Sequence, residues 1–166
     1  MSVYRYYSRE DGLCQTNGHF SLNLREGCLN AIDELLALTP GNTVGWVGCG
    51  DGRELLSIAT RYPDVSFFGY EINDAALNIA KRVLKTVQLS NVTLYHCDFT
   101  TKSDIYTHIY STALSGPKLY DHLRHACTHR LCMLDKMWTD KNLLFDRQSV
   151  RISGSGERRR LLATYF

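Results

Sequence analysis

The chain has 166 residues, of which 44% are hydrophobic and 22% are charged, and this is the composition of an ordinary globular protein. Its length suits a single domain that buries about 70% of the surface of the unfolded chain. No apolar stretch reaches the roughly 20 residues of a membrane span, and the first residues lack the apolar core of a signal peptide. We therefore expect a cytoplasmic or nuclear protein without a membrane partner.

The net charge of +2 is too small to indicate a nucleic-acid partner by itself. The run Arg158–Arg160 is a local basic spot, for which we favour solvated arginines on an edge strand over a binding patch. The six cysteines fall beside an expected ligand-binding turn or at helix and strand positions. We expect them to be reduced thiols that pack as small hydrophobic side chains.

Residues 1–23 mix aromatic residues with Gly, Ser, Asn and Asp without a steady period, and they predict an irregular arm. The core should span 24–166, so that one domain covers 1–166. Apolar residues from Leu24 to Leu38 recur at helical spacing, which predicts an amphipathic helix. Pro40-Gly41 then predicts a tight turn that leads into the first strand.

The segment from Thr43 to Leu56 reads as a buried strand, a turn with glycines at 48, 50 and 52, and the start of a helix. Glycine lets the backbone turn sharply and lets a ligand approach it closely. A strand, a glycine turn and a helix N-terminus together form a nucleotide-binding corner. The helix carries its apolar residues on one face, and we expect Pro63-Asp64 to end it.

An acidic residue closes the next apolar run, Val65–Tyr70, which predicts the second strand. Glu71 lies 19 residues after Gly52, the usual place for a carboxylate that binds ribose hydroxyls. An exposed charge at a strand end is the alternative interpretation. Asn73 is placed to cap a following helix, whose expected buried face is Ala76, Ile79, Ala80, Val83 and Val87.

The remaining chain continues the alternation of strands and helices. We expect strands at Val92–Cys97, Ile105–Ala113 and Arg130–Leu134, with a helix that begins at Gly116-Pro117. Two last strand-like runs, Gln148–Ile152 and Arg159–Phe166, are joined by a glycine-rich segment that predicts an antiparallel hairpin. The pattern predicts an α/β fold.

At the glycine turn and at Glu71 the chain resembles the class I S-adenosylmethionine-dependent methyltransferases, whose first motif is a strand that ends in Gly-x-Gly-x-Gly. The resemblance implies a Rossmann-like, seven-stranded methyltransferase fold with three α/β/α layers and a mostly parallel sheet that ends in a C-terminal antiparallel hairpin. It also implies the cofactor S-adenosylmethionine. Trp46 departs from the family, which usually has an acidic residue two positions before the first glycine.

The resemblance further implies a set of cofactor-binding residues. Glu71 would accept two ribose hydroxyls, Asp98 would accept the adenine amino group, and Phe99 would donate its backbone amide. A cap on the following turn is the alternative role of Asp98. The full set of expected cofactor-binding residues is Gly48, Cys49, Gly50, Asp51, Gly52, Glu71, Ile72, Asp98 and Phe99.

The methyl acceptor is harder to identify from the sequence. The Asn/Asp-Pro-Pro-aromatic loop of many amino-methyltransferases is replaced by residues 109–114, and the Lys-Asp-Lys-Glu tetrad of ribose methyltransferases is absent. Tyr110 and Ser111 are therefore the catalytic candidates nearest the transferred methyl group, and strand packing is their alternative role. We expect no metal site, because His122, His125 and His129 would share a helix face away from Cys132.

A weaker resemblance to the Rossmann-type, non-SET histone-lysine methyltransferases lies in Leu38-Thr39-Pro40-Gly41 and Gly69-Tyr70-Glu71. The family's polar Asn motif on the fourth strand and its long helical N-terminal region are missing. The leading hypothesis is methyl transfer to a macromolecular amine, with protein lysine favoured over nucleic acid. An RNA or DNA methyltransferase is one alternative, and an inactive binding or scaffold module, suggested by Trp46, is the other.

Overall fold

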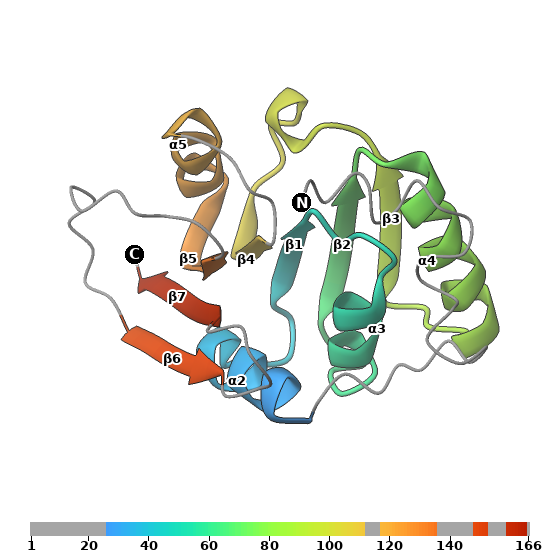
Figure 1. The fold of residues 1–166 in the computed structure, drawn as a ribbon, viewed down its shortest axis with the longest axis horizontal. Coiled ribbons are helices and arrows are strands. Elements are labelled where there is room, and N and C mark those ends of the chain that lie inside the picture. Colours follow the sequence, from blue (N-terminus) through green and yellow to red (C-terminus); the bar gives the residue numbers. More distant parts are fainter. Residues whose placement is uncertain (1–25, 112–116, 136–147, 153–158, 166) are drawn as a thin grey trace.

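The computed structural model describes residues 26–111, 117–135, 148–152 and 159–165 (Figure 1). The expected N-terminal arm, 1–23, lies outside these residues. The described helices are α2 (Glu26–Leu36), α3 (Arg53–Ala59), α4 (Asp74–Val87), the 3-10 helix η1 (Phe99–Thr101) and α5 (Pro117–His125). The described strands are β1 (Thr43–Val47), β2 (Ser66–Glu71), β3 (Val92–His96), β4 (Tyr106–Ser111), β5 (Cys127–Asp135), β6 (Gln148–Ile152) and β7 (Arg159–Tyr165).

The strands form one sheet in the order β3-β2-β1-β4-β5-β7-β6 (Figure 1). The first five pair in parallel, which confirms the predicted parallel α/β core. β7 pairs antiparallel with β5, and β6 pairs antiparallel with β7. The connection from β6 to β7 lies outside the described residues. The strand order reverses direction between β1 and β4, and ligands of open α/β sheets bind at such a point, beyond the carboxyl ends of the strands.

Two clusters of buried side chains lie between the sheet and its helices. The larger one joins α2, α3 and α4 to the sheet, and the smaller one joins α5 and η1 to it. Alternate residues of β1 supply the two clusters, because successive side chains of a strand point to opposite faces. Trp46 belongs to the larger cluster and Val47 to the smaller one. The described core therefore has the three layers expected from the sequence.

Two helix predictions are wrong in detail. α3 ends at Ala59 rather than at Pro63-Asp64. The Asn91 side chain donates to the carbonyls of Ala59, Tyr62 and Val65 at 3.2, 2.9 and 3.1 Å, so acceptors at the helix end are satisfied from outside. The second error concerns His129, which lies in β5 and so shares no helix face with His122, because α5 already ends at His125.

The capped helix α4 largely matches its prediction. The Asn73 side chain accepts a hydrogen bond from the Ala76 amide at 3.1 Å, which confirms the predicted N-cap. Ala76 and Ala80 are buried as expected, but Leu77 is buried as well, and the other expected core positions, Ile79, Val83 and Val87, are half-buried. Among the described helices, no segment combines the length and the hydropathy needed to cross a membrane.

Candidate functional site

The glycine turn connects β1 to α3 and is bonded to the end of β2. Gly48, Gly50 and Gly52 all have positive φ, at 75°, 57° and 78°, which side chains with a Cβ rarely adopt. The amides of Gly48 and Cys49 donate to the Tyr70 carbonyl at 2.8 and 3.0 Å. The turn therefore lies over the carboxyl ends of β1 and β2, as the sequence predicts.

Glu71 is the last residue of β2 and is 9% exposed, so it is not the exposed strand-end charge considered as an alternative. Its Oε2 accepts the Gly50 amide at 2.8 Å, and its Oε1 accepts the Asn73 amide, also at 2.8 Å. A carboxylate offers about four lone-pair positions. One bond to each oxygen therefore holds Glu71 in place and leaves a further acceptor position on each oxygen for ligand hydroxyls.

Two further residues of the turn have partners within the protein. Asp51 is buried, and its carboxylate accepts the Arg53 backbone amide at 3.2 Å and the Arg53 Nε at 2.8 Å. It therefore braces the first turn of α3. The Cys49 thiol lies in the core, where burial raises its pKa, so only the backbone of Cys49 remains to contact a ligand. The cofactor roles of both residues stay predictions.

The expected adenine-binding residues follow β3. Asp98 is exposed and caps η1, since its Oδ1 accepts from the Thr100 amide at 2.9 Å and from the Thr100 hydroxyl at 2.8 Å. The alternative role proposed for Asp98 is therefore present in the structure, while its role toward adenine stays a prediction. Phe99 is 3% exposed and packs edge-on against Tyr70. Ile72, beside Glu71, is 50% exposed.

Trp46 packs inside the core. Its side chain is fully buried in the cluster beneath α2 and α3, and its ring centroid lies 4.2 Å from that of Tyr110. Tyr110 is also fully buried, and its hydroxyl lies 3.5 Å from Glu54 Oε2. The indole therefore replaces the family's acidic residue without occupying the carboxyl edge. Packing in the core explains the presence of Trp46, which had suggested an inactive module.

Ser111 is the last residue of β4, next to Val47 of β1 and Met133 of β5 in the sheet register. It is 1% exposed, and within the described part of the chain its Oγ has no hydrogen-bond partner. A buried hydroxyl without a partner costs about 1–3 kcal/mol. This polar atom lies at the carboxyl end of β4, and its catalytic role stays a prediction.

Among the described residues, no group of three His, Cys, Asp or Glu side chains could hold a metal ion. Sequence reasoning missed two polar contacts near the site. The hydroxyls of Tyr70 and Tyr106 are hydrogen-bonded to each other, and burial together with this bond raises the pKa of Tyr70. His96 contacts the Ile72 carbonyl. The parallel register of β2 and β3, which no sequence pattern specifies, sets the second contact.

The geometry fits S-adenosylmethionine. The turn with three positive-φ glycines gives a ligand close access to the backbone, and Glu71 keeps acceptor capacity. Trp46 lies in the core, so its indole does not occupy this edge. Glycines 48, 50 and 52, Glu71 and Ile72 would hold the cofactor.

Solved structures share this fold. Magnesium protoporphyrin IX methyltransferase from Synechocystis PCC 6803, with bound SAM, is 17% identical over 84% of this chain and 79% of that chain, with a TM-score of 0.69. An RNA methyltransferase from Salinibacter ruber with S-adenosyl-L-homocysteine is 17% identical over 86% and 92%, with a TM-score of 0.70. Coclaurine N-methyltransferase with N-methylheliamine and SAH is 19% identical over 64% and 34%, with a TM-score of 0.59.

No curated protein matches the chain at a significant level. The family profile described as a methyltransferase domain matches residues 40–137, which is more than half of the chain. The matched segment runs from the turn before β1 to the end of β5, so it contains the glycine turn, Glu71 and Ser111. The sequence motifs, the sheet order and this match lead to one conclusion: the chain belongs to the family of S-adenosylmethionine-dependent methyltransferase domains.

Proposed function

We propose that this methyltransferase domain modifies an amine of a macromolecule, with a protein lysine as the preferred acceptor. The proposal for the acceptor rests on one observation. The buried hydroxyl of Ser111 has no hydrogen-bond partner among the described residues. An amine N–H can donate to this oxygen, which would orient the nitrogen lone pair toward the methyl group. The proposal includes the seven-stranded sheet with a C-terminal hairpin, supported by the antiparallel pairing of β5, β7 and β6.

Catalysis would consist mainly of positioning. When bound, S-adenosylmethionine supplies an electrophilic methyl group that a nucleophile attacks in line. Glu71 would accept the ribose hydroxyls, and the glycine turn would lie against the methionine portion of the cofactor. Ser111 would align the acceptor, and Tyr110 is the second candidate because its hydroxyl lies beside Glu54. Holding two reactants in the productive geometry can supply about 7–11 kcal/mol of a reaction barrier.

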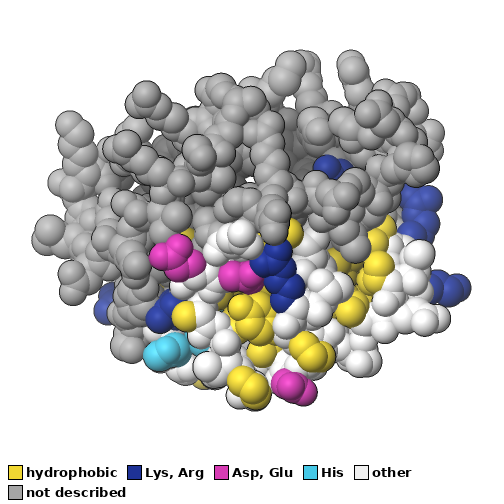
Figure 2. Space-filling view, turned by 90° about the horizontal axis from the view of Figure 1, so that it is seen from below, with side chains coloured by type: hydrophobic (Ala, Val, Ile, Leu, Met, Phe, Trp, Pro, Cys, Tyr) yellow, Lys and Arg dark blue, Asp and Glu magenta, His cyan; other side chains and the backbone are white. Residues whose placement is uncertain are grey.

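The face shown in Figure 2 offers little support for a nucleic-acid acceptor. On the face shown in Figure 2, Lys and Arg side chains lie at several separate places, with Asp, Glu and hydrophobic side chains elsewhere on the same face. Phosphate binding needs clustered cations, and it weakens steeply as salt rises. Arg158, the first residue of the basic run, lies outside the described residues.

A transfer assay with a tritiated methyl donor tests the acceptor class. Histones, bulk protein, RNA and DNA are offered separately to the wild type and to Ser111→Ala. We expect label in protein, and a rate about 10-fold to 100-fold lower for the variant, with unchanged binding of S-adenosylhomocysteine, because one oriented hydrogen bond is lost.

Each alternative has its own outcome in this assay. Label in RNA or DNA alone would replace the lysine proposal by the nucleic-acid alternative. Cofactor binding without transfer to any of the acceptors would favour the scaffold alternative. A Ser111→Ala enzyme as fast as the wild type would remove Ser111 from the acceptor site.

A further inference from the structure

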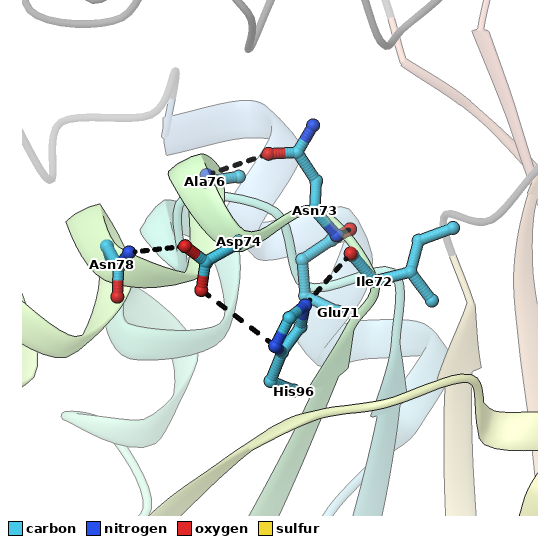
Figure 3. Close-up of polar contacts among 7 residues, drawn as sticks. All are labelled: Glu71, Ile72, Asn73, Asp74, Ala76, Asn78 and His96. Carbon is cyan, nitrogen blue, oxygen red and sulfur yellow. Dashed lines mark hydrogen bonds and ion pairs between the residues drawn. The ribbon is translucent and has the colours of Figure 1, made fainter.

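The segment that leads from β2 into α4 carries Glu71 and Ile72. Besides the Gly50 amide that donates to Glu71, three further contacts hold it. The Asn73 amide donates to Glu71 Oε1, and the Asn73 side chain accepts from Ala76. The third bond joins the Ile72 carbonyl to His96, as Figure 3 shows. The first two bonds lie within the segment and its helix. The third connects the segment to β3 through a side chain.

His96 ends β3 and lies opposite Glu71 in the parallel register. Its Nε2 is 3.1 Å from the Ile72 carbonyl oxygen, and its Nδ1 is 3.8 Å from Asp74 Oδ1. A carbonyl oxygen only accepts hydrogen bonds, so Nε2 must carry the proton. The Asp74 carboxylate lies on the other side of the ring, where Nδ1 faces it (Figure 3). The bond from Nε2 to the Ile72 carbonyl orients the imidazole.

The bond from His96 to the Ile72 carbonyl also sets the direction of the Ile72 side chain. The Ile72 carbonyl is directed toward His96, while the Ile72 side chain extends away from α4 (Figure 3). Ile72 is 50% exposed, and it is the next residue in the chain after the buried Glu71. An exposed isoleucine next to a fixed carboxylate can cover the apolar face of a ligand whose hydroxyls the carboxylate binds.

We propose that His96 is a positioning residue for the cofactor site. By donating to the Ile72 carbonyl, it holds the segment 71–73 in the conformation that presents Glu71 and Ile72 to the adenosine part of S-adenosylmethionine. A ligand that binds an already ordered segment loses less conformational entropy. This inference rests on the proposed cofactor contacts of Glu71 and Ile72.

Three variants test the inference: His96→Leu, His96→Gln and His125→Leu. His96→Leu removes the donor. His96→Gln keeps an N–H that can reach the Ile72 carbonyl. His125→Leu is the matched control, because the His125 Nδ1 also contacts a backbone carbonyl, that of Asp121 at 2.6 Å, but on α5.

Two quantities are measured in each protein: the Kd of S-adenosylhomocysteine by calorimetry, and the hydrogen exchange of the Asn73 amide without ligand. We expect His96→Leu to raise the Kd about threefold to tenfold and to speed exchange, because one net hydrogen bond is lost. We expect His96→Gln to stay within about twofold of the wild type in both, since it restores the donor. His125→Leu should change neither quantity.

The inference is overturned if His96→Leu behaves like the wild type in both measurements, or if His96→Gln is as impaired as His96→Leu. A wild type that does not bind S-adenosylhomocysteine would overturn the proposed cofactor site and the inference together. A wild type that binds, with binding lost in Glu71→Ala but kept in His96→Leu, would overturn the inference alone.

Discussion

At the carboxyl edge of the sheet, Glu71 holds two backbone amides and keeps acceptor positions open, and Ser111 has a buried hydroxyl without a described partner. At the amino edge, Thr43 and Thr107 bond each other reciprocally at 2.9 and 3.1 Å. There the Asn91 side chain binds three carbonyls. These polar groups at the amino edge are bonded within the protein. At the carboxyl edge, Glu71 and Ser111 have acceptor positions that no described protein group uses.

This difference in hydrogen bonding suggests that the amino ends of the strands serve stability, while their carboxyl ends also serve ligand binding. A polar group that is fully bonded within the protein contributes to folding but offers nothing to a ligand. We therefore expect substitutions at the carboxyl edge to change both stability and the affinity for S-adenosylhomocysteine. Substitutions at the amino edge should change stability while the affinity stays constant.

Gly52→Ala should give the largest stability effect. Gly52 has φ of 78°, and a Cβ there would lie 2.9 Å from the Ala80 Cβ, so strain and overlap add. We expect a loss of about 3 kcal/mol in urea unfolding together with weaker ligand binding. Gly41→Ala is the control, because Gly41 has φ of 83° but nothing within 4 Å of the added Cβ, so it should lose about 1 kcal/mol. Equal losses for the two variants would contradict the packing argument.

His108 of β4 should make the protein sensitive to acid. Its side chain is 2% exposed, and burial, aided by His129 and Arg130, lowers its pKa from 6.5 to about 4. The unfolded chain therefore binds the proton more readily than the folded protein. The contribution of neutral His108 to the free energy of unfolding is fully present above pH 6.5 and is lost as the pH falls toward 4. At pH 5 the loss should be about 2 kcal/mol relative to neutral pH.

Urea unfolding at neutral pH and at pH 5 measures this effect. His108→Gln cannot titrate, so its stability should fall about 2 kcal/mol less than that of the wild type between the two values. His125→Gln, at an exposed position on α5, should follow the wild type. An equal fall in His108→Gln and in the wild type would show that another group carries the acid sensitivity.

The parts of the fold that the sequence predicts are those that depend on local spacing. The glycine turn, the position of Glu71 and the Asn73 cap each require residues close together in the chain, and all three are present in the structure. The end of α3 differs from the prediction because Asn91, about 30 residues later, binds the carbonyl of its last residue, Ala59.

Contacts between strands account for the features that could not be predicted from the sequence. His96 reaches Ile72 only because β2 and β3 pair in a particular register, and Trp46 meets Tyr110 only because β4 lies beside β1. Side chains of these types could equally have faced solvent.

The central claim is that the carboxylate of Glu71 binds the cofactor, and the Kd of S-adenosylhomocysteine measured by calorimetry tests it most directly. Glu71→Ala removes the ribose acceptor and the bonds to Gly50 and Asn73, so the account predicts a Kd raised about 100-fold or more, since each hydrogen bond to a charged group is worth about 1.5–3 kcal/mol. Glu34→Gln, at an exposed position on α2, should bind like the wild type. A folded Glu71→Ala protein with wild-type affinity would contradict the account.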